Sequence, residues 1–283
     1  MAHTQFGILE KLMCQLDHER NDLYVQIDRK SRNFDQKYFE NICKKSRVTF
    51  VRRMSVHWGD SSIVECELRL LEAALNSGTE YAFLHLLSGN DLQIKTNSEV
   101  HKFFDGHPDI QFLAFRNVES GLSGLKRFYF FYPVRSYSRY LAKGLDLVSE
   151  GIQKILKVDR LKTNKMTLAK CQQWFSITQP CAEYVISKRV WIRKFTRFTS
   201  CSDEMFLATL LVNSPYRKQI FRAKDAYGHM RLIDRTRPEG ASPHTWRMED
   251  WEEIQRSYCF WARKFNEEVD PEVIEKVYET WKE

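Results

Sequence analysis

The chain has 283 residues, of which 43% are hydrophobic and 13% aromatic, with only 11 glycines. This composition excludes a disordered chain. The length suffices for one large or two small domains, which can bury most of the surface that the unfolded chain exposes, so disulfide bonds are not needed for stability. The formal net charge of +7 favours an anionic partner such as a nucleotide, a phosphate, a membrane surface or a nucleic acid, without choosing among them.

Cysteine usage and hydropathy narrow the class further. The seven cysteines are odd in number and form no CxxC pair, so a zinc site or a dense disulfide framework is not expected. We expect mostly buried free thiols in a reducing compartment. The sequence shows no signal peptide and no apolar run near 18 residues, so it predicts a soluble or peripheral protein.

Short apolar strands and amphipathic helices alternate through the first 117 residues. Helices are predicted at 6–19, 61–78 and 97–106, and strands at 23–28, 47–51, 81–87 and 112–117. Ser61 or Ser62 is expected to cap the second helix and Asn97 the third. This alternation predicts an α/β sheet with parallel strands, whose ligands bind outside the carboxyl ends of the strands. Asp28 and the loop 88–91 would then lie on one functional rim.

The second half is less regular. Residues 128–168 are predicted to be helical and basic, and 237–245 to be a loop. A strand is expected at 171–178, with helices at 179–187, 203–213, 248–257, 258–266 and 271–281.

The segment SCSDEMFLATLL (200–211) places Asp203 and Glu204 directly before an apolar run. In the structural interpretation, which is the commoner one for such a pattern, Ser200 or Ser202 caps a helix and the acids complement its dipole. In the functional interpretation, Glu204 is partly desolvated by its i+3 and i+4 neighbours, Leu207 and Ala208. Its proton affinity would then be raised, as a general base requires.

Other polar residues have two interpretations each. Asp28, at the end of LYVQID, is a turn residue or an acceptor for a ribose hydroxyl or a base N–H. The loop SGND, with Ser88, Gly89 and Asp91, is a plain turn or the lining of a ligand cleft. Arg231 and Lys264 are solvated surface cations, or they converge on a diphosphate and neutralise it without a metal.

Several common nucleotide-binding and catalytic motifs are absent from the sequence. The sequence contains no GxxxxGK[ST], no GxGxxG, no GxSxG, no HExxH and no D-x-D after a strand. Basic residues are interleaved with acids and follow no RNA- or DNA-binding pattern, so nucleic-acid binding is a weak alternative.

Read in order, seven segments resemble the Core-2/I-branching glycosyltransferase family, which includes branching β-1,6-N-acetylglucosaminyltransferases and peptide O-xylosyltransferases. The segments are DLYVQIDRKS (22–31), SVHWGDSSIVECELRLLEAAL (55–75), FLHLLSGNDLQIKTNSEVHKFF (83–104), QQWFSIT (172–178), SCSDEMFLATLLVNSPY (200–216), HMRLIDRTRPEGASPHTW (229–246) and ARKFNEEVD (262–270). Each is weak alone, and together they cover most of the chain.

The resemblance implies a GT-A type fold, a Rossmann-like mixed sheet flanked by helices, in a single domain. Residues 1–125 would form the nucleotide-sugar-binding half and 126–283 the catalytic and acceptor half. It further implies an inverting mechanism with a UDP-sugar donor and without a divalent metal or other cofactor. Glu204 matches the family's catalytic base, and Asp203 would cap or orient the helix.

The same resemblance assigns the donor site. Arg231 and Lys264 match the family's two diphosphate-binding cations, and Asp28 matches a nucleoside contact. Trp58 and Gly59 of the HWG segment would lie near the donor. Ser88, Gly89 and Asp91 would lie at its sugar end.

The sequence also departs from the family. Members usually begin with a strand ending in an Ala-His pair, whereas this chain starts at Met1-Ala2-His3, so we expect a truncated sheet edge or a native start upstream of Met1. The Golgi anchor and luminal disulfides of animal members are missing, which favours a bacterial relative in the cytoplasm, loosely attached to an anionic membrane. The resemblance does not identify the acceptor of this chain.

The donor expected from the resemblance is UDP-N-acetylglucosamine, and the acceptor is a cell-surface glycan. UDP-xylose transfer and an inactive nucleotide-sugar-binding module are the alternatives.

Overall fold

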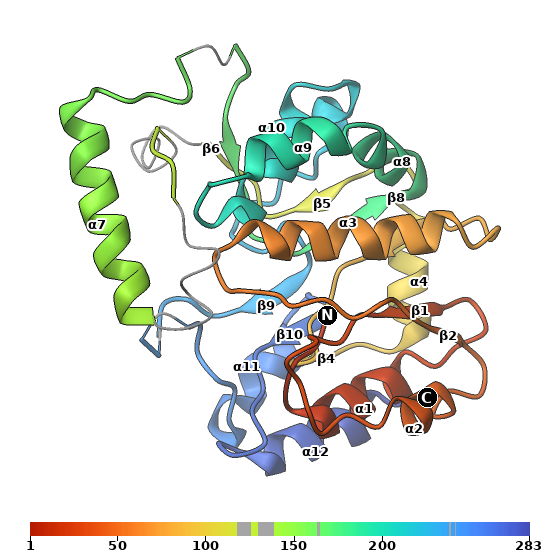
Figure 1. The fold of residues 1–283 in the computed structure, drawn as a ribbon. Helices are drawn as coiled ribbons and strands as arrows, with labels where there is room; N and C mark the ends of the chain where they lie inside the picture. The colour runs from red at the N-terminus through yellow and green to blue at the C-terminus, as the bar shows by residue number, and fades with distance from the viewer. Residues whose placement is uncertain (118–125, 130–138, 163–164, 238, 241) are drawn as a thin grey trace.

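Figure 1 shows a computed structural model of the chain that describes residues 1–117, 126–129, 139–162, 165–237, 239–240 and 242–283. Short strands lie in the middle of the molecule. Helices α8, α9 and α10 gather on one side of α3, and α1, α11 and α12 lie at the opposite end. Helix α7 stands at the edge of the molecule, apart from the other labelled helices.

The first half follows the predicted alternation closely. Its elements are α1 (Phe6–Gln15), β1 (Asp22–Val25), α2 (Gln36–Glu40), β2 (Arg47–Phe50), α3 (Ser61–Leu75), β3 (Phe83–His85), β4 (Asp91–Gln93), α4 (Asn97–Asp105), β5 (Phe112–Leu113) and β6 (Arg116–Asn117). The three predicted helices and the strands predicted at 23–28, 47–51 and 81–87 are confirmed, with bounds that differ by a few residues. The strand predicted at 112–117 is divided into β5 and β6, and α2 and β4 were not predicted.

The predicted caps lie one residue too far along the chain. Helix α3 is capped by Asp60, whose carboxylate accepts from the Ser62 N–H at 2.7 Å. Helix α4 is capped by Thr96 in a capping box with Glu99. A capping residue precedes the first helical residue, so a polar residue just outside the helix takes the role in both helices.

The second half contains α7 (Arg139–Ile155), β7 (Ala169–Lys170), β8 (Phe175–Thr178), α8 (Gln179–Ser187), α9 (Arg189–Thr196), the 3-10 turn η1 (Ser202–Glu204), α10 (Phe206–Val212), η2 (Pro215–Gln219), β9 (Arg231–Ile233), η3 (Met248–Asp250), α11 (Trp251–Arg256), β10 (Trp261–Arg263) and α12 (Pro271–Trp281). The helix predicted over 128–168 is confined, in the described part, to α7. Residues 118–125 and 130–138 lie outside the described residues.

The helix predicted over 258–266 is wrong, because this segment contains β10. Strand β10 is the central strand of the order β4-β10-β9, antiparallel to β4 and parallel to β9. Its neighbours come from residues 91–93 and 231–233, so pairing across the molecule outweighs the local pattern of 258–266.

In the described part of the chain, the predicted sheet with parallel strands is found only in the pairs β1–β2 and β9–β10. Strands β1 and β2 pair in parallel, but β8 lies between β3 and β5 and is antiparallel to both, and β6 and β7 are antiparallel. Strand β8 of the second half inserts between two strands of the first, and β10 pairs with β4, which produces the mixed arrangement that the family resemblance implies.

The core has two main parts. One cluster centres on α3, β8, α8 and α10, and a second on α1, β10 and α12. All seven cysteines are unpaired, as expected, and four are buried.

Candidate active site

Glu204 lies at the end of η1, not inside the buried helix, which begins only at Phe206. Its carboxylate forms an ion pair with Lys170, with 2.7 Å between Oε2 and Nζ, and the Glu204 side chain is 27% exposed. The Cys171 N–H donates to the Glu204 carbonyl at 2.8 Å, so the end of β7 lies against the turn. A carboxylate next to a cation therefore reaches the surface at this point.

The expected apolar burial belongs to Asp203. Its carboxyl group is buried, and Oδ1 has no hydrogen-bond partner in the described structure. Burial and the neighbouring Glu204 carboxylate raise the pKa of Asp203 to about 7. Cys201 occupies the N-cap position with φ 49°, and no side chain caps η1 or α10, so the capping predicted for Ser200, Ser202 or Asp203 is wrong.

A second buried carboxyl group, Glu67 of α3, lies behind the same turn. Gln173 Nε2 donates to Glu67 Oε1 at 2.9 Å, while Oε2 has no partner among the described atoms. Burial, with the charge of Asp203 as a second cause, raises the pKa of Glu67 well above its usual range. The sequence analysis missed Glu67, although its place on the apolar face of the helix, three residues after Val64, was a usable signal.

The HWG segment lies beside η1. The Cys201 N–H donates to the Gly59 carbonyl at 3.0 Å. Gly59 has φ 73°, in the left-handed region that favours glycine, and the Trp58 side chain before it is 65% exposed. Segments far apart in the sequence thus bring Trp58 and Glu204 to one edge of the molecule.

Asp28 organises the loop that leads to this segment. It is buried, and its carboxylate accepts from the N–H groups of Lys30 at 2.8 Å and Val56 at 3.4 Å. Lys30 Nζ lies 3.4 Å from the same carboxylate and donates to the Val56 carbonyl. Both oxygens are engaged by the local chain, so the structure places Asp28 in a turn role, and its contact with a nucleoside stays a prediction.

The SGND loop is fixed by its own aspartate. Asp91 Oδ2 accepts from the Ser88 N–H at 2.8 Å, and Oδ1 accepts from Arg263 Nη1 at 2.7 Å. The Arg263 guanidinium lies 4.3 Å from the centroid of the Trp174 ring. Asp91 is also completely buried, so the loop presents its backbone and Ser88 rather than this carboxylate.

Gly89 connects this loop to the start of the chain. Its N–H donates to the Met1 carbonyl at 2.8 Å, and a Cβ at this position would lie 2.6 Å from the Cβ of Ala2. Ala2 in turn forms a parallel bridge with Ile27. The SGND loop and the Asp28 loop are thus held together through Met1 and Ala2.

Lys264 lies next to the same loop. The Phe265 N–H donates to the Asn90 carbonyl at 3.0 Å, which places the preceding Lys264 against the loop. The Lys264 side chain is half-buried, and Nζ has no hydrogen-bond or ion-pair partner among the described residues. It is a cation available to an anionic ligand.

Arg231 differs from Lys264 in every respect. It is completely buried, over the ring of Trp261 at 4.6 Å. Its guanidinium donates to the carbonyls of Leu86 at 3.1 Å and Phe175 at 2.8 Å, to the His229 carbonyl and to Ser176 Oγ. Burial lowers the pKa of Arg231 to about 9. Arg231 is thus buried in the interior, whereas Lys264 lies half-buried beside the SGND loop, and their convergence on a diphosphate stays a prediction.

Arg247 is a cation that the sequence analysis missed. The Trp246 N–H donates to the Lys264 carbonyl at 3.0 Å, so the backbone brings Arg247 into the neighbourhood of Lys264. The Arg247 side chain is 34% exposed and forms an ion pair with Glu239 at 3.0 Å. The sequence offered a cue for Arg247, because the segment HMRLIDRTRPEGASPHTW, which resembles the family, ends at the residue before it.

A cavity of about 600 Å³ lies below the SGND loop, between β1 and β3. Apolar side chains of α1, β1, α3 and β3 form much of its walls, and polar residues such as Arg20, Glu67 and Ser88 also line it. Acidic side chains outnumber the one arginine in this lining, which does not suit a diphosphate.

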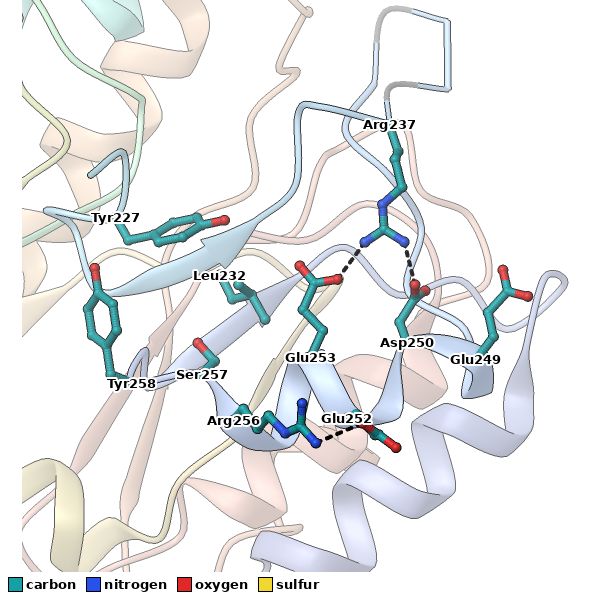
Figure 2. Close-up of a pocket in the computed structure, with 10 residues that line it drawn as sticks. All are labelled: Tyr227, Leu232, Arg237, Glu249, Asp250, Glu252, Glu253, Arg256, Ser257 and Tyr258. Atoms are coloured by element: carbon teal, nitrogen blue, oxygen red, sulfur yellow. Dashed lines mark hydrogen bonds and ion pairs between the residues drawn. The ribbon is translucent and has the colours of Figure 1, made fainter. Parts of the chain in front are cut away.

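Figure 2 shows a second, more open hollow of about 660 Å³ on the face of α11. Its arginines are engaged: Arg237 pairs with Asp250 and Glu253, and Arg256 pairs with Glu252. Acidic side chains outnumber basic ones in the lining, and none of the sequence-predicted site residues is among them. This hollow does not suit a diphosphate either.

Comparison with known proteins identifies the family of the chain. Residues 1–262 match the profile of the Core-2/I-branching enzyme family. Curated relatives include xylosyltransferase 2 of Rattus norvegicus and of Homo sapiens, each 25% identical over 94% of this chain and 31% of the relative. Xylosyltransferase 1 of Homo sapiens is 23% identical over 94% of this chain and 28% of the relative.

The chain thus spans about a third of the length of the curated relatives it matches. The match covers both halves of the chain, including β1, α3, β8 and η1, and it ends within β10, before Lys264. The mixed α/β architecture is consistent with the GT-A type, and the chain belongs to the Core-2/I-branching enzyme family.

Proposed function

We propose that this chain transfers a sugar from a UDP-sugar to a glycan hydroxyl with inversion at the anomeric carbon, and that Glu204 is the general base. The observation that carries the proposal is the Glu204 carboxylate, partly exposed, paired with Lys170 at 2.7 Å and next to the HWG segment. A positioned carboxylate with solvent access is what proton removal from an incoming hydroxyl requires.

In the proposed step, Glu204 takes the proton from the acceptor hydroxyl while that oxygen forms a bond to the anomeric carbon. The bond from the anomeric carbon to the β-phosphate oxygen breaks on the opposite face, and UDP leaves with the electron pair. The pairing with Lys170 supports this role because it holds the carboxylate in one orientation.

The departing UDP gains negative charge, which needs a cation nearby. Lys264 is the best supported group, since its ammonium is unpaired in the described structure and lies beside the SGND loop. Arg247 is the second, once its ion pair with Glu239 opens. Two cations of this kind support the proposal that no divalent metal is needed. Arg231 would act from below, by holding β8 and the strand end at Leu86 in place.

We propose two candidates for the sugar that the donor carries. N-acetylglucosamine is the sugar expected from the branching members of the family. The relatives reported above are named xylosyltransferases, which favours UDP-xylose as the second candidate. The two donors differ in their C2 and C5 substituents, so a side-by-side assay of both distinguishes them.

The test is release of UDP from each donor by the wild-type chain and by Glu204→Gln, in buffer with EDTA. The substitution is nearly isosteric, so we expect the rate to fall by about 10²- to 10⁴-fold. Lys218→Ala, an exposed cation outside the site, is the matched control and should behave as wild type.

Calorimetric titration with UDP and UMP separates binding from turnover. Glu204→Gln should bind UDP as wild type does, with UDP preferred over UMP. Retained activity in Glu204→Gln would show that another group is the base. UDP binding without turnover of either donor by wild type would favour the inactive binding module.

A further inference from the structure

Helix α7 presents its apolar side to solvent. Figure 1 shows it at the edge of the molecule, and its flank consists of large apolar side chains that are each at least 52% exposed. They are Tyr140, Leu141, Leu145, Leu147, Val148, Ile152, Ile155 and, just after the helix, Leu156. At 3.6 residues per turn these side chains occupy about half of the helix circumference. A contiguous exposed apolar surface of this kind marks an interaction site.

The polar side of α7 faces the protein. Gln153 is buried, and its amide donates to the Phe128 carbonyl at 2.8 Å and accepts from the Phe128 N–H at 2.7 Å. Gln153 also donates to Ser149 Oγ at 2.9 Å. This is the reverse of an ordinary surface helix, whose apolar face turns to the core. The side of the helix that would normally be solvated is the one that anchors it.

The surrounding sequence is strongly basic. Residues 126–170 contain eleven Lys and Arg against three Asp and Glu, a formal charge of +8, compared with +7 for the whole chain. Of the basic residues, Lys154, Lys157, Lys162 and Lys165 are exposed. Two copies of this segment would repel each other, whereas an anionic surface would attract it.

We propose that α7 anchors the protein on the surface of an anionic phospholipid bilayer, with its apolar face in the boundary between headgroups and acyl chains. An interfacial helix combines a wide apolar face with nearby Lys and Arg, which is the combination found here. No helix in the described part of the chain is long and apolar enough to cross a membrane. The proposed helix lies on the bilayer.

The docked helix would be connected to the candidate site. Arg160, shortly after α7, donates to the carbonyls of Phe195 at 2.9 Å, Arg197 at 3.0 Å and Phe198 at 3.1 Å. These residues lead directly into η1, which ends at Glu204. Contact of α7 with a bilayer would therefore hold the turn that carries Glu204 near the membrane surface.

The test is sedimentation of the full chain with sucrose-loaded vesicles, made either of phosphatidylcholine alone or of phosphatidylcholine with one third phosphatidylglycerol. We expect wild type to bind the anionic vesicles at least tenfold more tightly than the neutral ones, and less tightly as salt is added. Val148→Asp/Ile152→Asp should lose at least tenfold in this binding. Both positions are exposed, so folding, checked by circular dichroism, should persist.

Control variants carry the same types of substitution at exposed positions outside α7 and its basic surroundings. Val190→Asp/Val269→Asp replaces two exposed apolar residues of other segments and should bind as wild type. Lys154→Glu/Lys162→Glu should weaken binding, and Lys37→Glu/Lys218→Glu should reduce it less.

Equal binding by wild type and Val148→Asp/Ile152→Asp would overturn the proposal, and so would equal affinity for both vesicle types. A wild-type dimer in solution that Val148→Asp/Ile152→Asp converts to a monomer would also overturn it, by assigning the face to a second copy. None of these readouts depends on sugar transfer, so the proposal fails or stands separately from the proposed function.

Discussion

Two charged groups at the edge of the candidate site, Glu204 and Lys264, differ from Arg231 and Asp91 in the interior below it in how many hydrogen bonds the protein makes to them. At the edge, Glu204 has Lys170 as its partner and remains partly exposed, and Lys264 has no partner in the described structure. In the interior, Arg231 donates to four acceptors, and both oxygens of Asp91 accept hydrogen bonds. Groups at the edge are available to a ligand, whereas interior groups hold the strands on which the edge is built.

If interior charged groups hold the strands together, the largest effect of a substitution on stability is expected at Arg231. Replacing Arg231 by Met would leave the buried carbonyls of Leu86 and His229 without the donor that Arg231 supplies, whereas the Phe175 carbonyl would keep the Leu86 N–H. Each buried unsatisfied acceptor costs about 1–3 kcal/mol, so we expect the free energy of unfolding to fall by about 4 kcal/mol or more. Urea denaturation measures this, with the exposed Arg217→Met as the control. A variant as stable as wild type that has lost UDP binding would make Arg231 a ligand residue after all.

The buried carboxyl of Asp203 predicts a dependence of stability on pH. The pKa of Asp203 rises from 3.8 to about 7 on folding, so the folded state binds the proton more tightly than the unfolded state. The free energy of unfolding therefore falls as the pH rises between these two values. Asp203→Asn removes this loss. Relative to wild type, the variant should gain roughly 2–4 kcal/mol in unfolding free energy between pH 5 and pH 8, since one pKa unit is worth about 1.4 kcal/mol.

Thermal or urea unfolding of both proteins at the two pH values measures the difference, in which contributions common to both cancel. Glu67→Gln should show the same sign, because burial also raises the pKa of Glu67. A difference that does not change with pH would mean that Asp203 is ionised in the folded protein at pH 5.

The edge cations predict a smaller effect, on binding alone. Lys264→Ala and Arg247→Ala should each weaken UDP binding by about tenfold, or about 1.4 kcal/mol, while the urea midpoint stays within error. Calorimetry in EDTA measures the affinity, and Lys218→Ala is the control. Unchanged affinity in both variants would remove these cations from the proposed donor site.

The smallest effect is expected at Lys170. Its ion pair with Glu204 is partly exposed, and such pairs contribute about 0–1 kcal/mol to stability. Lys170→Met should therefore leave the unfolding free energy within about 1 kcal/mol of wild type while lowering the rate of UDP release several-fold. A stability loss as large as that of Arg231→Met would place Lys170 with the interior groups.

Much of the fold could be predicted from sequence because its elements follow local rules. The apolar spacing of residues 6–15 and 61–75 and the strand runs at 22–25 and 47–50 need only the periodicity of a helix or a strand. The segments resembling the family could be recognised in the same way, since they are contiguous.

The sequence by itself determined most helices and strands of the first half, although not α2 or β4, together with the charge balance and the family. Only the tertiary structure decided that 261–263 is a strand, that Arg231 is buried while Lys264 is not, and that α7 turns its apolar face outward. The physical reason is common to all three. Periodicity depends on residues within a few positions along the chain, whereas strand pairing and burial depend on groups from distant segments, such as β4, Ser176 and Phe128.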